Sequence, residues 1–258
     1  MTIPRLAVRN LLRNPRRTLL TLVAIFAGVA LVIVGRGLIA GMEESIIVGA
    51  TDTTVGHVLA RPAGYPTEGQ QFPVTDLLEL TPQARSLLDA QALAWTERLY
   101  FAPVATHGAE SLRVMAVGLD AVRDERVFPR ALWKVEGALP EEGSSDIAMS
   151  PRLAQLLGVR VGDTLVLQVR THKGALNALE VRVAGVVRTS NALFDLRSIQ
   201  VPMSLAKRLV SADTATHVSA RLASRDDAPR FAATLAGALG PAAEVVTWQQ
   251  ETEELIRL

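Results

Sequence analysis

Ser204 and Lys207 are the two residues whose types and spacing most directly suggest catalysis, because they form an S-x-x-K pattern. On a helix, residues three positions apart share a face, so the lysine amine could activate the serine hydroxyl as a nucleophile. Pro202 precedes the pair, however, and Ser204 suits a helix N-cap, which explains the serine by backbone capping alone. The accompanying S-D-N and K-T-G patterns are missing, since His172-Lys173-Gly174 lacks the threonine. We therefore expect no catalysis at this pair.

Other residues that commonly support chemistry are also unpromising. The acid pairs Glu141-Glu142 and Asp226-Asp227 fit turns or a helix start, where a carboxylate favours the helix dipole. No G-x-x-x-x-G-K-[ST] or G-x-S-x-G pattern occurs, and the absence of cysteine excludes thiol chemistry and disulfides. The histidines are scattered without the spacing of metal ligands: His57, His107, His172 and His217. We expect a protein that is not an enzyme, with no cofactor and no metal.

Hydropathy carries more information than these residues. Residues 18–35 form an eighteen-residue run without a charged side chain, and eleven of them are Leu, Ile, Val or Phe. A helix of about 20 apolar residues spans the hydrocarbon core of a bilayer. At about −0.3 to −0.6 kcal/mol each, these eleven residues favour insertion by about 3 to 7 kcal/mol. We predict a transmembrane helix, and its helical pattern continues to about residue 48.

Basic residues predict the orientation of this helix. Only Arg36 follows the run closely, the first acidic residue is Glu43, and five arginines precede the run: Arg5, Arg9, Arg13, Arg16 and Arg17. Basic residues close to a span stay cytoplasmic, so the N-terminus should be cytoplasmic and the remainder extracytoplasmic. The three- and four-residue steps also predict an amphipathic helix on the membrane surface, with guanidinium groups on anionic lipid. Alternatively, the arginines only set topology. This basic charge belongs to membrane lipid rather than to nucleic acid.

A cleaved signal peptide would share the basic and apolar order of this segment. The run is longer than a usual signal sequence, and no clear A-x-A-like site follows it, so we favour a retained anchor. Small residues recur at Ala24 and Gly28, and Gly37 and Gly41 form a GxxxG pair. Small residues let helix backbones approach closely, which predicts packing against other transmembrane helices.

About 210 residues follow the helix, enough for one large or two small domains with real cores. The periodicity predicts two β-α-β units at the two ends of this part, as in a ferredoxin-like α+β fold. Their expected elements are strand 55–60, helix 81–90, strands 93–106 and 112–117, strand 216–222, helix 226–239 and strand 243–248. A β-rich segment lies between them, with a helix over 150–158, a strand over 164–170 and a hairpin around Lys173-Gly174. The simplest architecture is one discontinuous subdomain with the other inserted into it.

Several segments resemble permease subunits of the macrolide-exporter and lipoprotein-release class of ABC transporters, a MacB/LolC/FtsX-like superfamily. The stretch A-x-x-L-G-V-x-V-G-D, residues 154–163, is the most specific. The similarity covers essentially the whole chain and is carried by LAVRNLLRNPRRTLLTLVAIFAGVALVIV (6–34), SPRLAQLLGVRVGDTLVLQV (150–169), VRVAGVVRT (181–189), D-x-x-S-I-Q-V-P-M-S-L-A (195–206) and VVTWQQ (245–250).

The resemblance implies an α+β fold in which a transmembrane helix precedes a discontinuous, porter-type ferredoxin-like subdomain with an inserted β-rich subdomain. The implied parts are 1–17 as the interfacial helix, 18–50 as the transmembrane helix extending into the periplasm, 51–122 and 206–250 as the two porter-like parts, 123–205 as the insertion, and 251–258 as the approach to a second span. Relatives continue into three more spans, so the chain is expected to be a fragment, a split gene product or a half-permease.

The resemblance also implies a role in the bacterial inner membrane. A separate cytoplasmic ABC ATPase would drive helix motions that the first span relays to the periplasmic domain, which moves lipoprotein, drug or peptide cargo. Expected partners are that ATPase, a second permease copy or paralogue, membrane lipid, and a periplasmic cargo or carrier. The hairpin is short for a lipoprotein-release member, yet its exposed position makes four residues candidates for a partner contact: His172, Lys173, Gly174 and Asn177.

A second interpretation stays open. The chain could be an extracytoplasmic binding or scaffold module on a single-span anchor that regulates envelope partners such as cell-wall hydrolases. The sequence identifies no pocket of recognition groups, so the cargo stays open as well.

Overall fold

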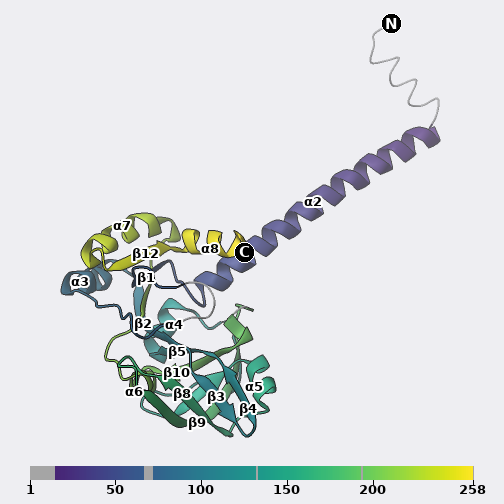
Figure 1. Ribbon diagram of the computed structural model, residues 1–258. Helices are drawn as coiled ribbons and strands as arrows, with labels where there is room; N and C mark the ends of the chain where they lie inside the picture. The colour runs from purple at the N-terminus through teal and green to yellow at the C-terminus, as the bar shows by residue number, and fades with distance from the viewer. Residues whose placement is uncertain (1–14, 67–71, 132, 193, 258) are drawn as a thin grey trace. The chain divides into compact units, whose positions relative to one another are not determined.

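The computed structural model describes residues 15–66, 72–131, 133–192 and 194–257 (Figure 1). The chain divides into two compact units, Met1–Ile46 and Ile47–Leu258, and each is described by itself. Most of the interfacial helix expected over residues 1–17, including Arg5, Arg9 and Arg13, lies outside the described residues.

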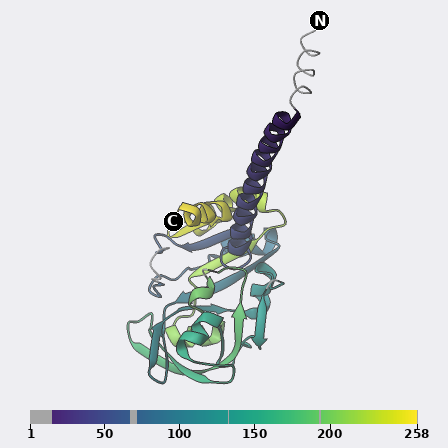
Figure 2. The ribbon, with the colours of Figure 1, turned by 90° about the vertical axis from the view of Figure 1, so that its right-hand side faces the viewer.

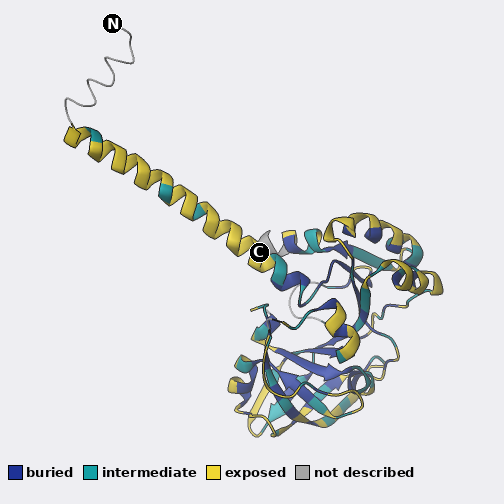
Figure 3. Ribbon diagram, turned by 180° about the vertical axis from the view of Figure 1, so that it is seen from behind, coloured by how far each residue is buried: buried dark blue, intermediate teal, exposed yellow. Residues whose placement is uncertain are grey.

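Helix α2 runs without interruption from Pro15 to Thr51, 37 residues that correspond to about 55 Å at the usual rise per residue. Proline is tolerated at the first position of a helix, and the rest of α2 contains none. Its apolar side chains are exposed; Phe26 and Leu31 are each 73% accessible. Figure 3 shows this exposure along nearly the whole helix. A helix this long and apolar can cross a membrane, where lipid would cover the exposed side chains.

A four-stranded antiparallel part of the sheet has the order β12-β1-β11-β2. Its elements in chain order are β1 (Val58–Pro62), α3 (Pro82–Gln91), β2 (Ala94–Phe101), β11 (His217–Arg221), α7 (Ala228–Leu239) and β12 (Ala243–Thr247). Two β-α-β units with the spatial order fourth, first, third, second form a ferredoxin-like fold. Helices α3 and α7 lie next to each other over this part (Figure 1) and share its apolar core. Thr81 caps α3 by accepting a hydrogen bond from the amide of Ala84, as its sequence predicts.

The segment between β2 and β11 continues the same sheet. Strand β5 (Met115–Leu119) pairs with β2 and is followed across the sheet by β10 (Ser198–Pro202), β7 (Asp146–Met149), β9 (Leu176–Arg188), β8 (Thr164–Arg170), β3 (Val104–His107) and β4 (Glu110–Arg113), while β6 (Lys134–Gly137) pairs with β9. The other helices are α4 (Ala121–Val127), α5 (Pro151–Leu157), α6 (Met203–Val210), α8 (Trp248–Arg257) and the 3₁₀ turns η1 (Phe194–Leu196) and η2 (Arg225–Asp227). The α+β class with a preceding long helix is confirmed. Because the sheet is continuous, the exact subdomain bounds stay a prediction.

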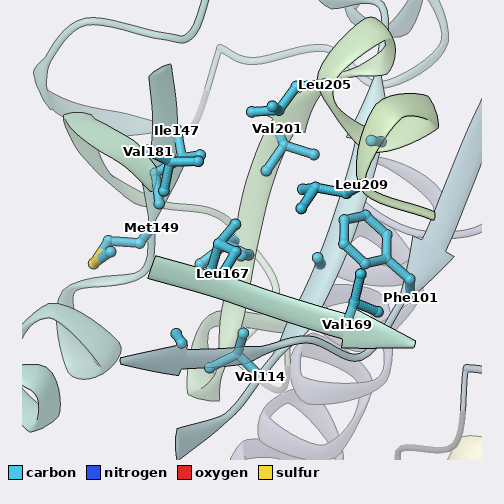
Figure 4. Close-up of a cluster of buried hydrophobic side chains, with 14 of the residues drawn as sticks. Phe101, Val114, Ile147, Met149, Leu167, Val169, Val181, Val201, Leu205 and Leu209 are labelled. Carbon is cyan, nitrogen blue, oxygen red and sulfur yellow. The ribbon is translucent and has the colours of Figure 1, made fainter. Parts of the chain in front are cut away.

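The larger core lies within this inserted segment. Strand residues such as Phe101, Leu167 and Val201 meet Leu205 and Leu209 of α6 (Figure 4), and α5 adds Leu153 and Leu157. Figure 2 shows the teal and green strands of the segment curving around its short helices. Burial of these side chains positions both the β8–β9 hairpin and the end of β9.

Three local predictions differ from the structure. The strand expected over 112–117 is divided between β4, which pairs with β3, and β5, which pairs with β2 and β10. The strand expected over 93–106 is split at Pro103, which has no amide hydrogen to donate; β2 pairs with β11 and β5, whereas β3 pairs with β4 and β8. The N-cap role expected for Ser204 is wrong, because α6 begins one residue earlier at Met203. The Glu142 carboxylate accepts the amides of Met203 and Ser204, and the Ser204 hydroxyl accepts the amide of Gly143.

Candidate functional site

One face of the ferredoxin-like part carries an arginine on each of three adjacent strands. Side chains alternate across a strand, and Val58, Ala60, Val218 and Ala220 face the core under α3 and α7. The opposite face therefore carries Arg61 of β1, Arg221 of β11 and Arg98 of β2. Arg61 and Arg98 are only 4% and 2% exposed, which is unusual for arginine. We call these three residues the arginine face.

Each arginine pairs with at least one carboxylate from a segment outside the four strands. Arg98 forms a bidentate pair with Asp124 of α4, with Nε–Oδ1 and Nη2–Oδ2 distances of 2.7 and 3.0 Å. Arg221 donates to Asp52, the residue after α2, at 2.9 Å. Arg61 bonds Glu244 of β12 at 3.0 Å and Glu251 of α8 at 3.2 Å. The arginine face thus holds α4, α8 and the chain directly after α2.

The surroundings of Arg98 keep its buried guanidinium protonated. Burial by itself lowers the pKa of the guanidinium, but the Asp124 carboxylate and Tyr100 raise that pKa above its ordinary value. The guanidinium lies 3.5 Å from the centre of the Phe128 ring and also donates to the carbonyl of Thr53. Buried ion pairs are desolvated at a cost, and removing one partner leaves an uncompensated charge. The contact between Arg98 and Thr53 therefore ties the segment after α2 to the most buried charges of the domain.

The last turn of α2 also contacts the inserted segment. A Cβ atom on Gly49 would lie 3.2 Å from the carbonyl oxygen of Ser190, so only glycine fits this approach without displacement. The hydroxyls of Thr53 and Ser190 are 3.2 Å apart. Ala50 packs in a small apolar cluster with Val55, Leu59 and Val246. Residues 49–55 are therefore held by the ferredoxin-like part and by the loop after β9 together.

The chain enters and leaves the sheet at the same end. Val58, at the start of β1, pairs with Thr247, at the end of β12, because the two strands are antiparallel. The amide of Trp248, the first residue of α8, donates to the carbonyl of His57 at 3.1 Å. The residues that follow α2 and the residues that begin α8 are thus neighbours.

The helix residues singled out from the sequence lie on an open surface of α2. Arg16 and Arg17 are exposed at the start of α2. Farther along the helix, Ala24, Gly28, Gly37 and Gly41 are exposed as well. Apart from the helix's own nearby backbone, no described atom lies within 4 Å of a Cβ built at these three glycines. Their packing against another helix, and the contact of the arginines with lipid, stay predictions.

Within the β8–β9 hairpin, the expected contact residues divide into two kinds. The backbone amide of His172 donates to the carbonyl of Val210. The ring Nδ1 of His172 lies 2.9 Å from the carbonyl oxygen of Val74. The side-chain Nδ2 of Asn177 donates to the carbonyls of Arg208 and Leu209 at 3.0 and 2.9 Å. His172 and Asn177 therefore attach the hairpin to the domain. Lys173 and Gly174 are exposed at the turn, where Gly174 adopts a φ of +83°, and their contact with a partner stays a prediction.

No cluster of three His, Cys, Asp or Glu side chains that could hold a metal occurs among the described residues. Ser204 and Lys207 are both half-buried, and Ser204 is engaged with Gly143 rather than with the lysine. The arginine face, which unites distant parts of the chain, was not predicted from the sequence.

A long exposed apolar helix joined to an α+β domain with a ferredoxin-like part and an inserted β-rich segment defines a membrane-anchored domain. The family model of the MacB-like periplasmic core domain matches residues 18–238, and the chain belongs to this family of ABC transporter permeases. The resemblance found in the sequence is thereby confirmed.

Two solved structures share this fold. The extracellular domain of the noncanonic ABC-type transporter YknZ from Gram-positive bacteria is 14% identical, with a TM-score of 0.50 over 73% of this chain and 100% of that one. The periplasmic region of MacB from Actinobacillus actinomycetemcomitans is 12% identical, with a TM-score of 0.52 over 82% of this chain and 98% of that one. No curated protein matches the chain.

Proposed function

We propose that this chain is a permease subunit that relays ATPase-driven motion through α2 to its extracytoplasmic domain, which moves lipoprotein, drug or peptide cargo. The observation that carries the proposal is the continuity of α2 with residues 49–55, which are held by Arg98, Arg221 and Ser190. Membership of a transporter permease family supports the same role.

Two properties of α2 support this role: the helix is uninterrupted, and its C-terminal end is held by the domain. Sharp kinks arise almost always at Pro, Gly/Ser pairs, π-bulges or inserted groups, and α2 is helical throughout. Separating a buried charge from its partner costs about 3–5 kcal/mol, so the joined end of α2 should move together with the sheet. Energy for the motion would come from a separate ABC ATPase, since the chain has no P-loop pattern.

The proposed setting is the bacterial inner membrane, with the N-terminus in the cytoplasm. Arg5, Arg9, Arg13, Arg16 and Arg17 would contact anionic lipid on that side. The small residues Ala24, Gly28, Gly37 and Gly41 would pack against other spans, and a second copy or paralogue would complete the transporter. The hairpin turn with Lys173 and Gly174 would contact a periplasmic cargo or carrier protein.

A direct test follows the domain while the ATPase turns over. The chain has no cysteine, so Ser111→Cys, which is exposed on β4, gives a single site for a fluorescent donor on the domain. The labelled chain would be purified from its native membranes with the ATPase that accompanies it and placed in lipid nanodiscs. With acceptor-labelled lipid headgroups in the nanodiscs, we expect ATP to change the energy transfer from the Ser111 donor to the membrane surface, and a non-hydrolysed analogue to trap one state. Identical energy transfer in all nucleotide states would contradict the proposal and favour a static scaffold.

A further inference from the structure

Strand β6 is a short edge strand that is open on one side. Lys134–Gly137 pair with Arg188–Gly185 of β9, and this is the one strand pairing of β6 within the described residues. All four residues of β6 are exposed, and Val135 remains 43% accessible. An edge strand presents unpaired amides and carbonyls that can accept another strand.

The charges on β6 complement themselves. Lys134 and Glu136 are two residues apart and so point to the same face of the strand. Neither forms an ion pair within the part of the chain that the structure describes. If two copies of β6 align antiparallel with Val135 opposite Val135, each Lys134 lies opposite the Glu136 of the other copy. Opposite charges that face each other across strands are stabilising, and like charges are destabilising.

The other face of β6 is apolar. Val135 lies on the face opposite Lys134 and Glu136, and Val161 lies beside the end of the strand, since a Cβ on Gly137 would lie 3.0 Å from one of its methyl groups. Val161 is itself 39% exposed. The same antiparallel alignment would bring the two Val135 side chains together and shield them from water on this face.

The position of β6 favours such a contact between anchored copies. Lys134 pairs with Arg188, two residues before Ser190, whose carbonyl approaches Gly49 in the last turn of α2. Four residues bury far less than the roughly 800 Å² per partner of a standard interface. Two copies anchored in one membrane, however, meet at a high effective concentration, so a small contact can suffice.

We propose that β6 pairs antiparallel with β6 of a second copy of this chain, with the two-fold axis at Val135. This inference gives the contact for the pairing of copies that the proposed function includes. A contact of this kind is isologous, since the same residues serve on both sides.

Single cysteines test the register. With Val135 at the axis, the two Val135→Cys Cα atoms would be about 4.5–5.5 Å apart, within the range of a disulfide. Two Lys134→Cys residues would be about 8 Å apart and outside that range. In native membranes treated with a mild oxidant, we expect Val135→Cys to give a disulfide-linked dimer at least tenfold more than Lys134→Cys or Ser111→Cys, which lies on the exposed strand β4.

A second experiment reverses the charges on β6. In the Val135→Cys background, Lys134→Glu should lower cross-linking severalfold, and Lys134→Glu combined with Glu136→Lys should restore it. Cross-linking of Val135→Cys no greater than that of Ser111→Cys, or no response to charge reversal, would overturn the proposal. Cross-linking at Met42→Cys of α2 without cross-linking at Val135→Cys would overturn the β6 contact while leaving the pairing of copies intact.

Discussion

Arg98 and Asp124 form a bidentate ion pair in which the arginine is 2% exposed and the aspartate is fully buried. The pair joins β2 to α4, and the same guanidinium reaches the carbonyl of Thr53 just after α2. A charge in the centre of the domain thus connects the sheet with the segment through which the membrane helix enters. The stability of the domain should depend on this pair more than on its surface ion pairs.

Asp124→Asn should lower the free energy of unfolding by about 3–5 kcal/mol, because Arg98 then stays buried without a carboxylate. Urea titration of the full chain in detergent measures this loss through tryptophan fluorescence, since Trp95, Trp133 and Trp248 all lie in the second unit. Asp146→Asn is the matched control, because it breaks the bidentate pair with Arg182 on the surface. Equal losses for the two variants would show that burial of the Arg98 pair has no special weight.

Gly49→Val should destabilise the domain, since a Cβ at this position would press on the backbone carbonyl of Ser190. Gly41→Val is the control on the same helix, because no described atom outside the helix's own backbone lies within 4 Å of its Cβ position. We expect the thermal midpoint of the second unit to fall by several degrees for Gly49→Val and to stay unchanged for Gly41→Val. A midpoint unaltered by Gly49→Val would mean that the loop after β9 does not hold α2.

Acid should weaken the domain through two buried histidines. Burial lowers the pKa of His217 to about 3 and also lowers that of His57, whose Nδ1 accepts the amide of Leu222. The unfolded chain takes up these protons near pH 6.5 and the folded chain does not, so stability is full above that pH and falls below it. For His217 alone, the loss between pH 7 and pH 5 is about 2 kcal/mol.

Urea midpoints at pH 7 and pH 5 measure this effect. His217→Gln should reduce the pH dependence, even if it also lowers stability at pH 7. His107→Gln is the control, because it removes a half-buried histidine whose Nδ1 lies 3.1 Å from the carbonyl oxygen of Leu157. The same slope with pH in all three proteins would rule out His217 as its source.

Arg61→Met should release α8 while keeping the apolar stem of the side chain. The variant removes the bonds to Glu244 and Glu251, and bonds to charged groups contribute about 1.5–3 kcal/mol each. Amide protons of α8 should then exchange with solvent at least tenfold faster, as measured by mass spectrometry. Arg85→Met, which breaks an exposed pair with Glu97, should leave α8 unchanged. Slow exchange of α8 in Arg61→Met would contradict the assigned role of Arg61.

Local signals predicted much of the secondary structure. Thr81 and Pro82 mark the start of α3, and Gly158 ends α5 in a left-handed conformation, as such residues usually do. The order of strand and helix at the two ends of the domain also predicted the ferredoxin-like part. Pro103 could have revealed the break between β2 and β3, because proline interrupts strand pairing.

The arginine face escaped prediction for a physical reason. Charged residues that alternate with apolar ones in strands usually indicate a solvent-exposed face. Arg98 follows that pattern in β2, and nothing nearby in sequence shows that α4 covers it, since Asp124 lies 26 residues away. Arg61 and Glu251 are 190 residues apart. Such pairs depend on the assembled sheet, which local periodicity does not encode.

Two insertions between Met42 and Glu43 test whether α2 carries motion into the domain as a stiff lever. Seven flexible Gly/Ser residues and seven helix-forming Ala/Glu residues add equal length, and seven residues keep the helical phase within about 20°. The readout is the ATP-dependent change in energy transfer between a donor at Ser111→Cys and acceptor-labelled lipid headgroups. We predict that the helical insertion preserves this change and that the flexible insertion abolishes it. An equal ATP response in both proteins would contradict the lever.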